Sequence, residues 1–135
     1  MAKTPTIAEL TWIRDLTLSG TSGHASITLD SAGLAGPSPM QALGFALAGC
    51  MTMDIAHTLT KGRHTFRALH SRLVADRAPD DPHRFVRVTL HVTAEGAVPA
   101  EAVDRAIALS REKYCSVWHS MRQDIEFTTT YDVRA

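Results

Sequence analysis

The stretch Ser38–Lys61, SPMQALGFALAGCMTMDIAHTLTK, decides the fold because it is the most apolar part of the chain and carries signals for both ends of a helix. Ser38 is a favourable N-cap residue, and Pro39 suits the first helical position. Apolar side chains cover several sides of this segment, so we expect a buried helix that runs to about residue 59. Lys61 and Gly62 supply the cationic last turn and the C′ glycine that are typical of a helix end.

The two cysteines point to thiol redox chemistry. Cys50 lies in the middle of the apolar helix, and Cys115 follows much later in the stretch EKYCSV at Glu112–Val117. Gly44 and Gly49 each cost about 1 kcal/mol in a helix interior relative to alanine. We therefore expect another backbone, or a ligand, to approach the helix closely beside Cys50. A thiol pair of this kind suits chemistry on a peroxide or a disulfide.

Composition and charge predict an ordinary single domain over 1–135. Of the 135 residues 44% are apolar, and Lys plus Arg and Asp plus Glu each number 14, so no surface for nucleic acid or an acidic membrane is expected. We predict no membrane span, because no run of about 20 apolar residues occurs, and a cytoplasmic location, because the N-terminus lacks an apolar signal segment. In that compartment cysteines are reactive thiols more often than structural bridges. Without a CxxC pair or a Cys/His cluster we expect no metal and no cofactor.

Strand and helix patterns surround the central helix. In chain order we predict a strand pair at 9–18 and 24–30 with its turn at 19–23, a strand pair at 65–77 and 84–95 with its turn at 78–82, helices at 99–113 and 115–121, and a last strand at 124–133. Ser110 falls on the buried stripe of the first of these helices. The order β-β-α-β-β-α-α-β describes an α+β domain without internal repeats.

The helix face around Cys50 leaves several interpretations open. Asp54 and His57 are three positions apart and share a face, so with a third ligand they would form a metal site. With Cys50, His57 would instead suggest a Cys/His hydrolase. The plainer interpretation is that Asp54 lines the site or an interface and that His57 is a hydrogen-bonded helix residue. An ionised Asp54 would oppose a thiolate at Cys50, so a thiolate there needs a cation from elsewhere.

These features together resemble the OsmC/Ohr family, the osmotically inducible and organic-hydroperoxide-resistance proteins. The resemblance covers nearly the whole chain: a first hairpin, a central helix with the pattern sP-x-x-x-L…A-x-x-x-C, a strand pair, and a helix with a second cysteine near its end. The segments GPSPM at Gly36–Met40 and EKYCSV at Glu112–Val117 are most similar to the family's uncharacterised OsmC-like branch.

The resemblance implies an OsmC-like fold and an intertwined homodimer, with both central helices buried in its middle and two active sites at the subunit interface. Cys50 matches the peroxidatic cysteine of the family and Cys115 its resolving cysteine. The substrate would be a small-molecule peroxide, and an external dithiol would reduce the disulfide that forms between the two cysteines.

The chain departs from the family's peroxidases near the start of the central helix. Those proteins carry a glutamate there that holds an arginine, whereas this chain has Met40 and Gln41. Gln41 therefore becomes a pocket candidate, together with Asp54. Candidates for the activating cation are Arg14, His24 and Arg63. The apolar residues that we expect to form a substrate wall are Leu43, Phe45, Leu47 and Met51.

We therefore predict a Cys-based hydroperoxide reductase, an antioxidant enzyme that acts on organic or inorganic hydroperoxides. The pocket walls favour an apolar hydroperoxide over hydrogen peroxide. The alternative is a non-catalytic OsmC-like dimer that binds a small apolar ligand or senses thiol oxidation. The missing glutamate favours this alternative.

Overall fold

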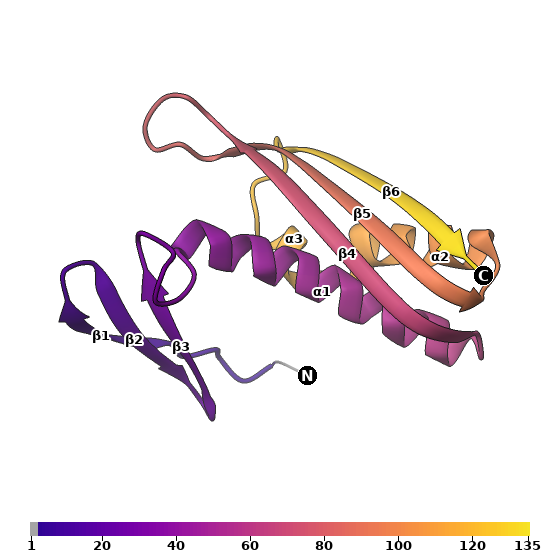
Figure 1. Ribbon diagram of the computed structural model, residues 1–135, viewed down its shortest axis with the longest axis horizontal. Helices are drawn as coiled ribbons and strands as arrows, with labels where there is room; N and C mark the ends of the chain where they lie inside the picture. The colour runs from indigo at the N-terminus through magenta and orange to yellow at the C-terminus, as the bar shows by residue number, and fades with distance from the viewer. Residues whose placement is uncertain (1–2) are drawn as a thin grey trace. The chain divides into compact units, whose positions relative to one another are not determined.

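The computed structural model describes residues 3–135 and contains two compact units, one that ends at Leu43 and one that comprises Gly44–Ala135 (Figure 1). Helix α1 (Pro39–Lys61) contributes residues to both units. The α+β class that we predicted is confirmed. A single domain over 1–135 stays a prediction, and each unit is described by itself below.

The N-terminal unit is an antiparallel sheet in the order β1-β2-β3, formed by Glu9–Arg14, Thr17–Ser22 and Ala25–Asp30. Our prediction of a two-stranded hairpin was therefore wrong by one strand. The first strand ends at Arg14, and the chain turns at Asp15, which has a φ of 46°. The segment Thr17–Ser22 is a strand that pairs with both β1 and β3, and we had predicted a turn over most of it.

Gly20 explains why the serine- and glycine-rich segment is a strand. A Cβ atom at this position would lie 2.8 Å from Leu10 Cδ2 and 3.1 Å from Ile27 Cγ2, the side chains of its two cross-strand partners. Glycine inside a strand is typical of such a close approach. The glycine at position 20 is therefore required by close packing between strands. We had interpreted it as a sign of a turn.

Helix α1 confirms the segment that we placed at the centre of the fold. Ser38 and Gln41 form a capping box: the Gln41 backbone N–H donates to Ser38 Oγ (3.1 Å), and the Ser38 N–H donates to Gln41 Oε1 (2.9 Å). At the other end Arg63, with φ of 62°, is the left-handed C′ residue, so the prediction of Gly62 was wrong by one position. The His64 N–H donates to the Leu59 carbonyl (3.0 Å), which is the long bond of a Schellman motif.

The C-terminal unit is a sheet in the order β4-β5-β6, with the helices on one face (Figure 1). Strand β5 (Phe85–Ala97) pairs antiparallel with β4 (Thr65–Arg77) and parallel with β6 (Glu126–Arg134). A parallel neighbour requires a crossover connection. That crossover consists of α2 (Ala100–Leu109), a π-helical turn η1 (Ser110–Tyr114) and α3 (Ser116–His119), and it carries the second cysteine.

The core of this unit lies between the sheet and α1. Four alternating residues of β5 are fully buried; they are Val88, Leu90, Val92 and Ala94. Helix α1 contributes a stripe of buried residues one turn apart, which are Leu47, Met51, Ile55 and Leu59. The expectation that α1 is buried on all sides is not met within the chain, because Phe45 is 72% exposed and Met53 is 74% exposed.

Helix α1 also has the length and mean hydropathy (1.3) of a membrane span, and among the described residues it is the one helix that does. The core helix of a soluble protein meets the same criteria. Thr52 Oγ1 lies 2.7 Å from Ser71 Oγ on β4, and the buried stripe packs within the unit. We therefore interpret α1 as a core helix.

The burial of β5 predicts a large effect of core truncation. Replacing Leu90, which is 0% exposed, by alanine should lower the free energy of unfolding by about 2–5 kcal/mol, because a cavity remains in the core. The matched control is Leu34→Ala, since Leu34 is 88% exposed and its loss should change stability by about 0.5 kcal/mol or less. Urea denaturation measures both values, and equal losses in the two variants would contradict this description of the core.

Candidate functional site

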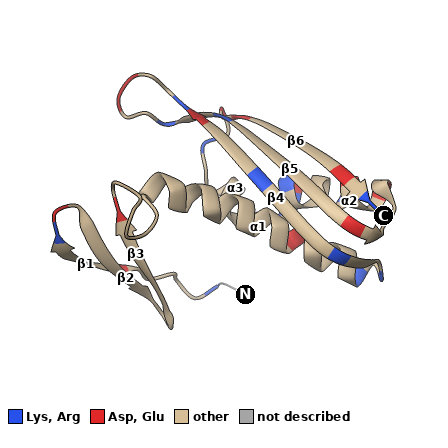
Figure 2. Cartoon of the chain, in the orientation of Figure 1, with Lys and Arg blue, Asp and Glu red and all other residues tan. Residues whose placement is uncertain are grey.

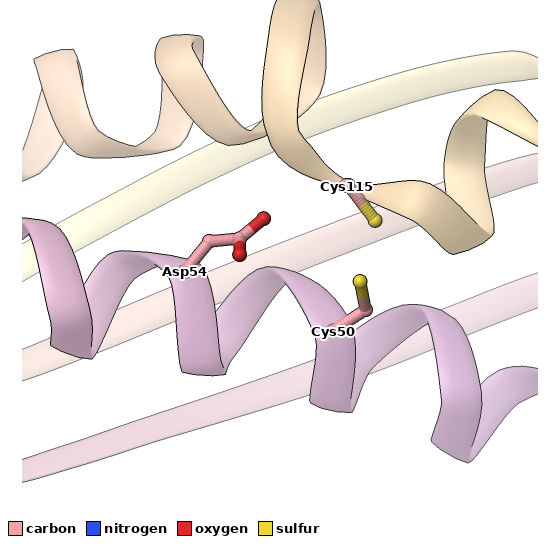
Figure 3. Close-up of side chains that lie close together, drawn as sticks. All are labelled: Cys50, Asp54 and Cys115. Carbon is pink, nitrogen blue, oxygen red and sulfur yellow. The ribbon is translucent and has the colours of Figure 1, made fainter. Parts of the chain in front are cut away.

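Three side chains from two parts of the C-terminal unit meet beside α1. The sulfur atoms of Cys50 and Cys115 and a carboxylate oxygen of Asp54 all lie within 4.8 Å of one another. Figure 3 shows both cysteines and the carboxylate directed toward one space, with Cys50 and Asp54 on α1 and Cys115 between the crossover helices. The structure thus brings together three of the residues that we singled out from the sequence. We call them the thiol-carboxylate cluster.

The π-helical turn η1 positions Cys115. The Cys115 backbone N–H donates to the Ser110 carbonyl at 2.8 Å, which closes a wider turn than an α-helix has. The next residues start α3 with Cys115 as N-cap, and its sulfur accepts a hydrogen bond from the Trp118 N–H at 3.3 Å. The Trp118 ring packs on Phe127 of β6, with ring centroids 4.6 Å apart. Hydrogen bonds on both sides of the helix break therefore hold Cys115, through its backbone N–H on one side and its sulfur on the other.

Ser110 fixes the third member of the cluster. Its hydroxyl donates a hydrogen bond of 2.7 Å to Asp54 Oδ2, and Ser110 is 1% exposed. Sequence reasoning placed Ser110 on the buried stripe but gave it no role at the site. The available signal was a hydroxyl group on an otherwise apolar helical face, since a buried hydroxyl needs a hydrogen-bond partner.

The two thiols differ in exposure and in acidity. Cys50 is half-buried, whereas Cys115 is 0% exposed. Burial raises the pKa of Cys115 to about 11; the Trp118 N–H acts against this rise, and the neighbouring Cys50 adds to it. Cys115 therefore remains a protonated thiol near neutral pH. Of the two cysteines, Cys50 is the one that is in part exposed to solvent.

The helix surface next to Cys50 is open. A Cβ atom at Gly49 would meet nothing within 4 Å among the described residues, and one at Gly44 would make an ordinary contact of 3.7 Å with Leu73 Cδ2. The close approach of another backbone that we expected does not occur within the described chain. The alternative expectation, space for a ligand beside Cys50, agrees with the opening at Gly49.

Charge is sparse along α1, the helix that carries Cys50 and Asp54. Figure 2 shows basic and acidic residues interleaved along the strands of the C-terminal unit, where Arg87 donates to Glu126 at 2.7 Å. Asp54 is the one charged residue of α1 before Lys61. Within Gly44–Ala135 the hydrogen bond that its carboxylate receives comes from Ser110. The cluster therefore combines one thiol and one carboxylate on α1 with a second thiol between η1 and α3.

The other pocket candidates lie in the N-terminal unit or in caps. The Gln41 side chain completes the capping box of α1. Arg14 is the exposed last residue of β1, and His24 is exposed in the turn before β3. Arg63 caps the end of α1. The roles of Gln41, Arg14 and His24 near Cys50 stay predictions.

The predicted substrate wall divides into two kinds of residue. Leu47 and Met51 are fully buried and belong to the core. Phe45 is exposed and Leu43 is half-buried, so these two remain candidates for a wall. His57 is exposed and is not part of the cluster, so neither the Cys/His hydrolase nor the Asp54–His57 metal site gains support.

Comparisons with known proteins agree on one family. A family model described as "OsmC-like protein" matches residues 30–130. Protein YhfA of Escherichia coli (strain K12) is 34% identical over 131 residues, which cover 95% of this chain and 98% of YhfA. A hypothetical protein from Aquifex aeolicus VF5 is similar in structure, with a TM-score of 0.91, 24% identity and 98% of each chain covered. An organic hydroperoxide resistance protein OsmC from Legionella pneumophila has a TM-score of 0.73 at 16% identity, covering 98% of this chain and 100% of that chain.

Proposed function

This chain belongs to the OsmC-like protein family, and from that membership and the geometry of its cysteines we propose that it reduces organic hydroperoxides by thiol chemistry. The observation that carries the proposal is the approach of the Cys50 and Cys115 sulfurs to within 4.8 Å, from a long helix and from a helix break far along the chain. Two thiols at this distance need only a small movement to form a disulfide.

The first step oxidises Cys50. Its thiolate attacks one peroxide oxygen, the O–O bond breaks, and the alkoxide that leaves takes up a proton and becomes an alcohol. The peroxide is reduced, and Cys50 becomes a sulfenic acid. Cys50 suits this role because it is half-buried and beside the open surface at Gly49, whereas Cys115 is fully buried.

The second step joins the two cysteines. The Cys115 sulfur attacks the sulfenic sulfur of Cys50, the S–O bond breaks, and the hydroxide leaves as water with the proton of the Cys115 thiol. The Asp54 carboxylate, which Ser110 holds in place, lies in the same cluster and relays that proton from the Cys115 thiol to the leaving hydroxide. An external dithiol then reduces the disulfide by two thiol–disulfide exchanges, and both cysteines return to thiols.

The exposed face of α1 supports an apolar substrate and a homodimer. Phe45 and Met53 are both more than two-thirds exposed on the helix that carries Cys50. Large exposed apolar side chains are typical of a binding or subunit interface. We propose that a second copy of the chain covers part of this face and that the substrate's alkyl group enters beside it.

Steady-state turnover tests the proposed function. With a dithiol as reductant, cumene hydroperoxide should be consumed about tenfold or more faster than hydrogen peroxide, a difference of about 1.4 kcal/mol that apolar contacts to the substrate readily supply. Turnover of both peroxides at the rate of a free thiol of equal concentration would contradict the proposal.

A second candidate function is a sensor of thiol oxidation. The observation that favours it is Asp54, because a carboxylate beside Cys50 opposes the negative charge of a thiolate. A sensor would form the same disulfide slowly and would show no continuous turnover with a dithiol. The steady-state assay therefore separates the two candidates.

A further inference from the structure

We propose that the reduced thiol-carboxylate cluster binds a thiophilic divalent metal ion, zinc above all, through Cys50, Asp54 and Cys115. Binding itself does not rest on the proposed peroxidase function. Our expectation from the sequence was no metal site, because the chain lacks a compact Cys/His motif. The structure supplies the third ligand from a residue 65 positions beyond Cys50, which no local motif reveals.

The spacing of the ligands fits one metal ion. Cys50 and Asp54 are four positions apart on α1, which places two ligand atoms on one face of a rigid helix, as in other helical metal sites. Zinc lies about 2.3 Å from a thiolate sulfur and about 2.0–2.2 Å from a carboxylate oxygen, so tetrahedral ligand atoms are separated by roughly 3.4–3.8 Å. All three atoms here lie within 4.8 Å of one another, and small side-chain rotations close the remaining gap.

Hydrogen bonds from outside the cluster hold two of the ligands. The Ser110 hydroxyl donates to Asp54 Oδ2 at 2.7 Å, and a carboxylate has further acceptor sites with which to bind a metal ion. The Trp118 N–H donates to the Cys115 sulfur at 3.3 Å. Such outer hydrogen bonds orient metal ligands and stabilise their charged forms. Each comes from the crossover, on the opposite side of the cluster from α1.

Chemistry and access select the kind of metal ion. Two thiolates and one carboxylate carry three negative charges, and their soft sulfurs favour zinc over magnesium or calcium. Cys115 binds as a thiolate after a metal ion displaces its proton, so affinity should increase with pH. Three protein ligands leave the fourth position of a tetrahedral zinc ion for water, and Cys50, which is half-buried, gives the site its access to solvent. A bound zinc ion would occupy the same sulfurs that a hydroperoxide oxidises.

Cobalt serves as a spectroscopic probe of this site. Reduced protein titrated with Co²⁺ should develop the near-ultraviolet absorption of cobalt–thiolate bonds at one ion per chain, and Zn²⁺ should remove it by competition. Protein whose cysteines have been oxidised to the disulfide should show no such band. Absence of the band in reduced protein, or an equal response of the oxidised form, would overturn the proposal.

Two variants test the ligand set. Ser110→Ala should weaken Zn²⁺ binding by about 10–100-fold, because the ligand Asp54 loses its outer hydrogen bond. Asp54→Asn should weaken it at least as much, whereas Asp104→Asn, a matched change of an exposed residue on α2, should leave it unchanged. Equal affinity of the Asp54→Asn variant and the wild type would exclude the three-ligand site.

A measurement on the wild type alone guards against variants that do not fold. Zn²⁺ should slow the alkylation of Cys50 by iodoacetamide at least tenfold, and Mg²⁺ should have no effect; an unchanged rate with Zn²⁺ would contradict metal binding. These experiments contain no peroxide. Cobalt binding without hydroperoxide turnover would therefore count against the proposed function alone, and turnover without cobalt binding against the metal site alone.

Discussion

Replacing Cys50 by serine is expected to abolish hydroperoxide reduction, with turnover falling at least about 10³-fold, to the level of the buffer. A serine hydroxyl does not attack the O–O bond at neutral pH, and the remaining sulfur cannot take over. Cys115 is fully buried, and its pKa of about 11 keeps it protonated. The measurement is consumption of cumene hydroperoxide in the presence of a dithiol.

Two controls make the result of Cys50→Ser specific. Circular dichroism should show unchanged secondary structure, because Cys50 is half-buried and serine is nearly the same size. Ser116→Ala, a change of an exposed residue beside Cys115, should retain full turnover. Substantial turnover by the Cys50→Ser variant would refute the assignment of the nucleophile.

Replacing Cys115 by serine is expected to separate the two steps of the reaction. Oxidation of Cys50 should proceed at the wild-type rate, but the sulfenic acid should persist, because the chain contains no third cysteine to resolve it. Turnover with the dithiol should fall at least about tenfold. The sulfenic acid is measured by trapping with dimedone and mass spectrometry.

The Cys115→Ser variant is suited to this test because serine preserves the local fold. Cys115 is the N-cap of α3 and accepts the Trp118 N–H, and a serine hydroxyl is a better N-cap acceptor than a thiol. A loss of activity in this variant therefore reports on chemistry. Rapid turnover without a trapped sulfenic acid would show that Cys115 is not the resolving cysteine.

The central helix and the long strands were predictable because their patterns are local. The N-cap at Ser38, the apolar run of α1 and the alternation in β5 each depend on neighbours a few positions away. The bounds predicted for β4, 65–77, agree with the structure. Strand β2 was missed because its Gly20 was interpreted as a turn residue. The reason for a glycine there is the close packing of two cross-strand side chains, which a sequence pattern does not reveal.

The candidate site was predictable in its members and not in its arrangement. Cys50, Asp54 and Cys115 were each singled out, but Ser110 acquires its role through a hydrogen bond across 56 positions of the chain. The exposure of Phe45 and Met53 also depends on what covers α1 from outside. The apolar pattern of α1 predicts burial on all sides, and the single chain buries one stripe.

The most direct test of the central claim is to map the sulfurs after a single turnover. Reduced wild-type protein is mixed with one equivalent of cumene hydroperoxide, quenched with an alkylating reagent and digested for mass spectrometry. We predict a Cys50–Cys115 disulfide within one chain, a mass lower by two hydrogen atoms, and one equivalent of the alcohol. Recovery of both cysteines as alkylated thiols would contradict the account, and so would oxidation of Cys50 no faster than that of a free thiol.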